Sequence, residues 1–177
     1  MFKDFRPVLM ILLRFLAIYL IPMIVYQLLY INHYQGLGLD PFSKWVGSQS
    51  CAVQTFLGYP SRMVDAPGYD TSWFLVSGKY PSRMVEGCNA VSVMLLFAAF
   101  VFAFYKGART FLFAGLGIVL LHVMNVLRIA GLNILILEHP EYTKAGHDYF
   151  FPAIIYGTVV VLWIVWIKFF ALKNENR

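Results

Sequence analysis

Four long runs of apolar residues dominate the pattern of hydrophobic and polar positions along the chain. They cover about residues 8–31, 89–105, 110–137 and 150–172. A helix needs roughly 20 residues to cross a hydrocarbon core about 30 Å thick, so each run predicts a transmembrane helix, the second short and the third long. The first run is longer than the apolar core of a secretion signal, and no small-residue cleavage site follows it, which favours a retained span.

The third run is too long for a straight crossing. Its 28 residues would reach about 42 Å at ~1.5 Å per residue. The helix must therefore tilt, protrude or break, and Gly131 is the predicted position of a break. If the helix starts at the cytoplasmic edge near Thr110, Arg128 lies about 27 Å along it and so close to the outer edge of the hydrocarbon.

Residues 32–87, between the first two runs, are too long for a simple connector and predict a small extracytoplasmic segment of mixed structure. Asp40 followed by Pro41 predicts a helix N-cap and a first helical residue. The apolar positions that follow predict an amphipathic helix ending near Gly58. This helix lies either along the membrane surface or packed on the other helices.

The hexapeptide YPSRMV occurs twice in this segment, as residues 59–64 and 80–85. Between the copies come a turn-rich DAPGYD, a β-rich SWFLV and a turn-like SGK, an order that predicts a small hairpin. The proline inside each copy limits that copy to an edge strand. We interpret the hexapeptide as framework. The second copy leads directly to Cys88, which makes Arg83 a candidate substrate-guiding neighbour and Arg62 its solvated counterpart.

Composition and charge support a membrane location. Hydrophobic residues make up 60% of the chain and charged residues 13%, with a mean hydropathy of +0.68, whereas a soluble domain is about half apolar and a quarter charged. With both termini cytoplasmic, the cytoplasmic side carries eight Lys and Arg against two acids, and the outer side five against seven. The net charge of +5 is therefore a topology signal, and we expect no nucleic-acid partner.

These patterns predict an all-α integral membrane protein, a single membrane domain over residues 1–177. It has about four transmembrane helices and a small mixed extracytoplasmic insert, residues 32–87, between the first two.

Cys88 stands at the start of the second run. The N-terminus of a helix carries unpaired N–H groups and the positive end of the helix dipole, which favours a thiolate. Glu86 opposes this effect unless it is paired. An inert interfacial thiol is one alternative. A disulfide with Cys51 is another, because both cysteines are expected on the outer side, where oxidation occurs.

Arg128 lies within the third run, and an ionisable residue inside a span is a functional-site hypothesis by default. At about 100° per residue, it shares one arc of about 140° with three other polar residues. These are His122, Asn125 and Asn133. The arc must face other helices, either as a polar clamp between them or as part of a site.

His147 lies about one turn before the fourth run, where Asp148 is predicted to cap the helix. His139, beside Pro140, is interpreted as an ordinary surface histidine. Cys88, Arg128 and His147 come from three elements, yet the predicted topology places all three at the outer membrane boundary. Such a set provides a thiol nucleophile, a cation for a developing oxyanion and a histidine that moves a proton.

No other chemistry has a signal of comparable specificity. The spacing of Cys and His predicts no metal site. No glycine-rich phosphate loop or dinucleotide fingerprint occurs, so no cofactor is predicted.

Three motifs in this order resemble those of the exosortase and archaeosortase family: EGCNAVS with a span following, NVLRI in a later span and GHD before the last one. The family carries an E-[AG]-C-type motif, an N-x-x-R motif and a downstream histidine. The resemblance covers about residues 85–152 and is strongest to the short XrtF-type members. The chain departs from the fuller pattern in having about four predicted spans instead of about eight, and Asn89-Ala90 where Ser-Gly is more usual.

The resemblance implies a membrane cysteine protease or transpeptidase that acts on exported proteins. Their C-terminal sorting signals consist of a short motif, a transmembrane tail and a basic end. The enzyme would cleave this signal at the outer face of the bacterial cytoplasmic (inner) membrane and transfer the protein to an envelope acceptor. The implied partners are therefore the exported substrates, the lipid bilayer and that acceptor.

Carried over by motif, Cys88 would be the nucleophile, Arg128 the transition-state stabiliser and His147 the general acid/base. The supporting residues would be Asn125, Glu86 and Asp148.

Two other functions stay open on the residues alone. The short bundle, the aromatic content of 18% and the outer segment also suit a non-catalytic scaffold or assembly subunit for surface export. The pair Cys51 and Cys88 would suit a thiol-redox membrane protein.

Overall fold

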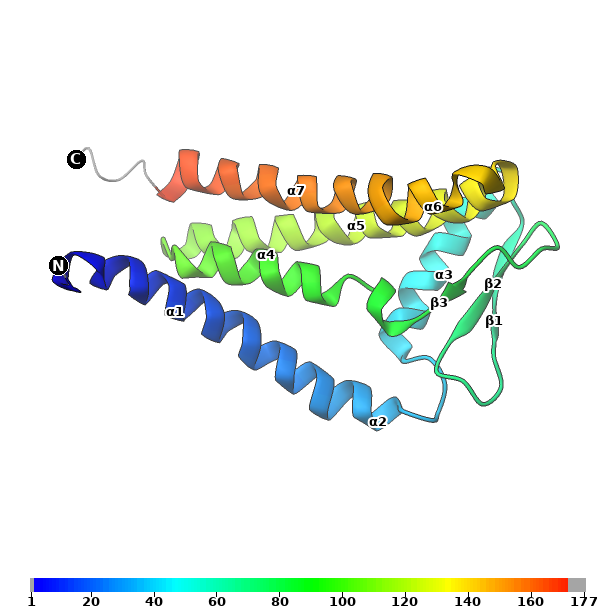
Figure 1. The fold of residues 1–177 in the computed structure, drawn as a ribbon, viewed down its shortest axis with the longest axis horizontal. Coiled ribbons are helices and arrows are strands. Elements are labelled where there is room, and N and C mark those ends of the chain that lie inside the picture. The colour runs from blue at the N-terminus through cyan, green and yellow to red at the C-terminus, as the bar shows by residue number, and fades with distance from the viewer. Residues whose placement is uncertain (1, 172–177) are drawn as a thin grey trace.

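A computed structural model describes residues 2–171, as a bundle of helices with a small sheet at one end (Figure 1). The described start of the first helix and the described end of the last lie at the opposite end of the bundle from the sheet (Figure 1). The main helices are α1 (Phe2–Val25), α3 (Pro41–Phe56), α4 (Val91–Ala103), α5 (Ala108–Glu138) and α7 (Phe151–Trp166). Short helical segments are η1 (Tyr26–Ile31), α2 (Asn32–Tyr34), η2 (Glu86–Cys88), η3 (Pro140–Tyr142), α6 (Thr143–Ala145), η4 (Gly146–Phe150) and η5 (Ile167–Ala171).

Three helical stretches are long and apolar enough to cross a membrane. They are Val8–Tyr34, Ala108–Glu138 and Pro140–Phe170. They correspond to the first, third and fourth predicted spans, and the last begins earlier than predicted. The second predicted span, residues 89–105, contains a shorter helix, α4, of 13 residues or about 20 Å. The length and composition of these helices indicate a multi-pass membrane protein.

The long helix α5 runs without interruption through its 31 residues, about 46 Å. The break predicted at Gly131 is absent, because this glycine provides room for the ring of Phe151 from α7 and keeps helical geometry. The C-terminal half of α5 is covered by the segments before α7 and by α3. One contact between α3 and α5 is a hydrogen bond from the Ser50 hydroxyl to the Val126 carbonyl, at 3.3 Å.

The helix α3 begins as predicted. Asp40 caps it, its carboxylate accepting the Ser43 N–H at 2.9 Å, and Pro41 is the first helical residue. The helix ends at Phe56, close to the predicted Gly58. Its polar residues Ser50 and Gln54 are fully buried, so of the two predicted positions the helix takes the packed one, between α5 and the sheet.

The sheet has three antiparallel strands in the order β1-β2-β3. They are β1 (Ser61–Asp65), β2 (Ser72–Val76) and β3 (Arg83–Met84). Both copies of YPSRMV provide edge strands on either side of SWFLV, as predicted, and both prolines lie outside the strands. The fold is therefore mostly helical with a small sheet, where the sequence predicted an all-α protein with a mixed insert.

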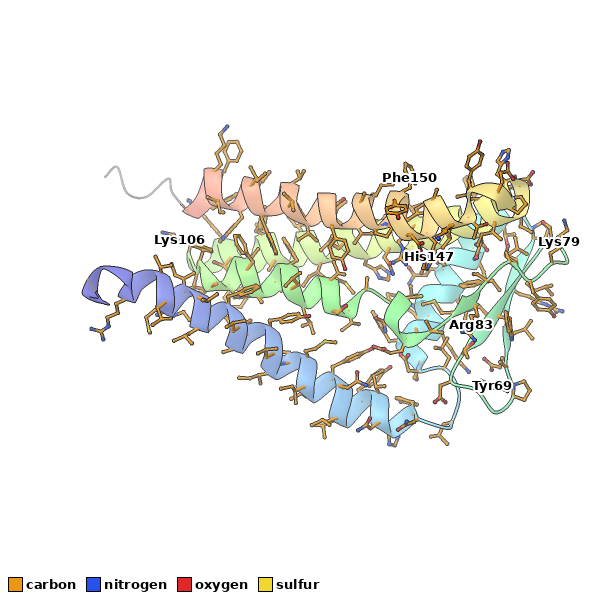
Figure 2. The ribbon with its side chains drawn as sticks, viewed as in Figure 1. Tyr69, Lys79, Arg83, Lys106, His147 and Phe150 are labelled. Atoms are coloured by element: carbon orange, nitrogen blue, oxygen red, sulfur yellow. The ribbon has the colours of Figure 1, made fainter. Side chains whose placement is uncertain are left out.

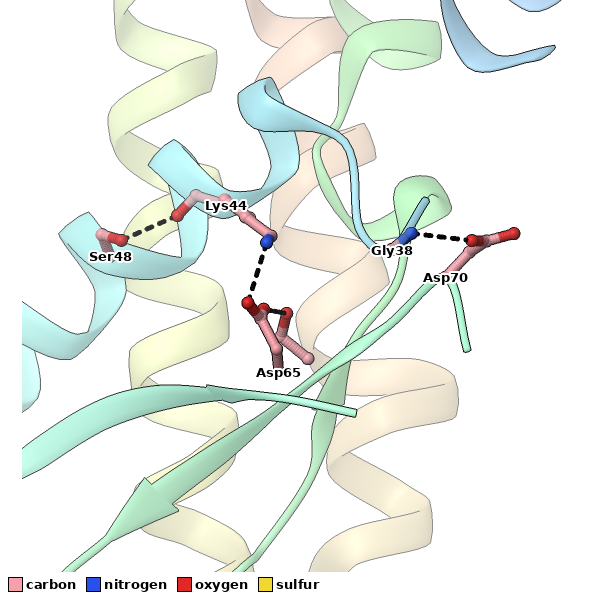
Figure 3. Close-up of polar contacts among 6 residues, drawn as sticks. Gly38, Lys44, Ser48, Asp65 and Asp70 are labelled. Atoms are coloured by element: carbon pink, nitrogen blue, oxygen red, sulfur yellow. Dashed lines mark hydrogen bonds and ion pairs between the residues drawn. The ribbon is translucent and has the colours of Figure 1, made fainter. Parts of the chain in front are cut away.

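Polar contacts join the parts of the insert (Figure 3). Lys44 of α3 lies 3.0 Å from the Asp65 carboxylate of β1. The Ser72 hydroxyl, which donates to Asp65 at 2.7 Å, and the Lys44 ammonium hold the pKa of that carboxyl below its usual value. The loop before α3 is tied to the β1–β2 turn by the Gly38 N–H, which donates to Asp70 at 3.2 Å.

Two apolar cores result. One joins α3, the sheet and the C-terminal half of α5, and its buried members include Val46, Phe74, Val76, Met84 and Val126. The other lies among α4, α5 and α7, and its buried members include Phe97, Val101, Leu121, Val159 and Trp166. The first core positions the insert over one end of the bundle.

Candidate active site

A cavity of about 380 Å³ lies between the sheet, the C-terminal half of α5 and the segment before α7. Its polar, charged and sulfur-bearing lining includes Ser82, Arg83, Cys88, Arg128, Asn133 and His147. The three residues expected at one depth therefore line one cavity. Figure 2 shows His147 and Arg83 near the sheet end of the bundle, away from Lys106 at the other end.

Cys88 ends the short 3₁₀ turn η2, where its N–H bonds to the Val85 carbonyl at 3.0 Å. Cys88 was predicted at the N-terminus of the second span, and the structure places it before the helix. The helix α4 begins only at Val91, whose N–H donates a hydrogen bond to the Asn89 side-chain oxygen at 3.0 Å. Cys88 is thus a partly buried, free thiol on a turn of its own, outside the first turn of α4.

Ala90 connects this turn to α4 in a left-handed conformation, with φ of 61°. A non-glycine residue pays about 1–2 kcal/mol for that conformation. The bend between Cys88 and α4 is therefore made at a non-glycine residue, and the backbone is strained there.

Asn125 connects the arginine to the cysteine turn. Its amide donates to the Cys88 carbonyl at 2.9 Å, and its side-chain oxygen accepts from Arg128 Nη1 at 3.1 Å. Asn125 is fully buried, so both bonds are shielded from water. This predicted supporting residue fixes the guanidinium relative to the thiol turn.

His147 lies in the π-helical segment η4, which continues into α7. The predicted cap is wrong, because the helix has already begun and Asp148 caps nothing. The Asp148 carboxylate lies 2.9 Å from His147 Nδ1. An Nδ1–H that donates to it leaves Nε2 as the proton-accepting nitrogen of the ring.

Within residues 2–171, no hydrogen bond joins the side chains of Cys88, Arg128 and His147 to one another. The three side chains line a common space without contacting one another.

Glu86 does not share this cavity. It lines a smaller one, of about 140 Å³, together with Asp40, Asp70 and Gln27. The turn η2 separates the two cavities, so residues only two positions apart face different surroundings. The structure thus gives Glu86 no contact with the thiol pocket.

The other polar residues of α5 mainly join this helix to α3 and to the segment before β3. His122 lies 2.9 Å from Gln49 of α3 and stacks on Trp45 at 4.8 Å. Asn133 accepts a hydrogen bond from Ser82 and also lines the cavity. His139 lies outside the thiol cavity and is exposed, at 3.4 Å from Glu141, in agreement with an ordinary surface histidine.

Both cysteines are free thiols. Cys51 is buried in the core of the insert, and burial raises the pKa of its thiol to about 11. The predicted alternative of a disulfide between Cys51 and Cys88 is therefore not formed in this structure.

Sequence reasoning missed several residues that line the cavity, among them Trp73, Ser82 and Thr143. Ser82 and Thr143 are ordinary polar residues in segments with no periodic signal. Trp73 had a signal, since alternation along SWFLV places it on the sheet face opposite to Phe74, which is buried. Among the described residues, no cluster of three or more His, Cys, Asp or Glu side chains could hold a metal ion.

Compared with models of protein families, with curated proteins and with solved structures, the chain gives no match. The resemblance of its three motifs to exosortases therefore stays a prediction.

Proposed function

We propose that this protein is an exosortase-like membrane cysteine peptidase or transpeptidase. In this proposal it cleaves the C-terminal sorting signals of exported proteins at the outer face of the bacterial cytoplasmic membrane. The single observation that carries the proposal is the shared cavity, into which separate elements bring Cys88, Arg128 and His147.

The proposed topology has four crossings and both termini in the cytoplasm. Three of the crossings are the helices of spanning length. The remaining crossing, second along the chain, is α4 with its flanking residues. Counted from the start of α5 at Ala108, Asn125 lies about 26 Å along the helix and Arg128 about 30 Å. With Ala108 at the cytoplasmic edge, the cavity therefore opens at the outer edge of a hydrocarbon core about 30 Å thick.

The proposed reaction begins when His147 Nε2 takes the proton of the Cys88 thiol, and the resulting thiolate attacks the carbonyl carbon of a peptide bond just outside the membrane. The Arg128 guanidinium stabilises the oxyanion, held in place by Asn125. His147, oriented by Asp148, gives that proton to the leaving amine as the C–N bond breaks, and the transmembrane tail departs. The thioester is then resolved by an amine, a hydroxyl or water, to which His147 acts as base.

A co-expression experiment tests this proposal. Reporter proteins with a short linker, an apolar tail of about 20 residues and a basic end are expressed with wild type or a variant, and processing is followed by the loss of the tail. We expect Cys88→Ser to abolish processing. We expect Arg128→Ala and His147→Ala to slow it about 10²-fold or more, because each removes stabilisation of a charge or proton transfer in the transition state.

His139→Ala is the matched control for His147→Ala, since His139 is also exposed but lines a different cavity. Processing that continues with Cys88→Ser would contradict the proposal. Export that depends on the protein but not on Cys88 would instead support a non-catalytic scaffold.

A further inference from the structure

The thiol cavity has an unusual balance of charge. Arg83 of β3 and Arg128 of α5 both line it, and no lining residue is an acid. Arg128 is engaged by Asn125. Arg83 has no ion pair or side-chain hydrogen bond among the described residues, so its guanidinium is free to receive a ligand.

Arg83 also stands where the cavity meets a second one. It shares with Trp73 the lining of a cavity of about 460 Å³, which the turn between β1 and β2 completes. The one acid in that lining is Asp65, and it is already paired with Lys44 at 3.0 Å. Neither cavity therefore offers Arg83 an unengaged carboxylate, and the ligand that complements it has to bring one.

The backbone beside Arg83 suits an extended peptide. In the pairing of β2 with β3, the Phe74 N–H donates to the Ser82 carbonyl at 3.0 Å, while Arg83 stands opposite Trp73. Hydrogen-bonded and non-hydrogen-bonded pairs alternate in antiparallel ladders, so Arg83 turns its own N–H and C=O away from β2. Within residues 2–171, no strand pairs with that edge, and an extended segment can add to it.

We propose that Arg83 is a specificity residue that binds a side-chain carboxylate of the polypeptide substrate, close to the bond attacked by Cys88. This inference rests on the proposed peptidase function and adds a substrate preference to it. A guanidinium presents a planar pair of donors that matches a carboxylate, and a neutral amide of the same shape lacks the charge that strengthens those bonds. The substrate thus carries Asp or Glu within a few residues of the cleaved bond.

The first test needs no substrate. Iodoacetate and iodoacetamide both alkylate a thiol with loss of iodide, and they differ in carrying a carboxylate or a neutral amide. We measure their rates at Cys88 in the purified full-length protein by peptide mass spectrometry. The iodoacetate-to-iodoacetamide rate ratio should fall about fivefold in Arg83→Gln, consistent with the loss of a charge-assisted hydrogen bond at a partly exposed site.

Arg62→Gln is the matched control, because Arg62 has the same place in the first YPSRMV copy and lies outside both cavities. We expect it to leave the ratio unchanged. A ratio that is the same in Arg83→Gln and wild type, an equal fall in Arg62→Gln, or a Cys88 that neither reagent reaches would each overturn the inference.

The second test uses tailed reporters that differ only in Glu or Gln just before the apolar tail. Wild type should process the Glu reporter faster, and in Arg83→Gln the Glu reporter should fall to the rate of the Gln reporter. Cys88-dependent processing with no preference would overturn the inference and leave the proposed function standing. Processing that continues in Cys88→Ser would overturn the function, while the alkylation ratio would still decide whether Arg83 binds a carboxylate.

Discussion

The two copies of YPSRMV form the two edges of one sheet and share a framework role. In each copy the arginine is exposed and the methionine points toward α3. Both methionines approach Gly47, where a Cβ would collide with the Met63 thioether and lie 3.6 Å from Met84 Cγ. The repeat therefore places two equivalent side chains on one glycine of α3.

The copies differ in what lies next to them. Arg62 lies beside a surface hollow with Pro60 and Gly78, whereas Arg83 lines the cavity that contains Cys88. The same six residues thus form framework at one edge and the wall of a candidate active site at the other. The chemistry available to each arginine is therefore determined by the segments that lie beside its strand.

The largest expected difference is between the modification rates of the two thiols, Cys51 and Cys88. At pH 8, about one in a thousand Cys51 side chains is a thiolate, given a pKa of about 11, and burial also blocks access. We expect N-ethylmaleimide to modify Cys88 at least about 100-fold faster, as measured by peptide mass spectrometry.

Modification of Cys51 should rise about tenfold with each pH unit up to about 11, because its thiolate fraction rises in that proportion below the pKa. In SDS, where the fold is lost, both cysteines should react alike. Equal rates in the folded protein at pH 8 would contradict the assigned burial of Cys51.

The next largest difference is between the contributions of Met63 and Met84 to the free energy of unfolding. Met84 has no exposed surface and Met63 is half-buried. Met84→Ala should therefore lower the free energy of unfolding by about 2–5 kcal/mol, and Met63→Ala by less. Denaturant unfolding in detergent, followed by tryptophan fluorescence, measures both. Met84→Leu, which keeps the volume, should cost less than about 1.5 kcal/mol, and a larger loss would argue against a simple packing role.

The smallest effect concerns the turns that follow the copies. The chain after the first copy bends at Gly68 with φ of 80°, and after the second at Ala90 with φ of 61°. Ala90→Gly should raise the free energy of unfolding by about 1 kcal/mol, since it relieves the left-handed strain. Gly68→Ala, with nothing near its Cβ position, should lower it by a similar amount. Changes of the same sign in the two variants would refute this account.

Much of the fold could be predicted because its signals are local. Asp40 and Pro41 start α3 through bonds within one turn, and alternation along SWFLV marks a strand with one buried face. Predictions that depended on an exact boundary failed. Cys88 lies before α4 and Asp148 lies inside a helix, because α4 begins only after the left-handed Ala90 and the last helical stretch begins earlier than hydropathy alone indicates.

For the candidate site, the sequence by itself determined the residue types and the apolar helices that carry them, since hydropathy and capping act over a few neighbouring residues. Only the tertiary structure decided which of these residues meet. Contacts between α3, α5 and the sheet place Arg83 and Cys88 in one cavity and Glu86 in another, although Glu86 is only two positions from Cys88. The physical reason is that the packing of distant segments determines the direction in which each turn points its side chains.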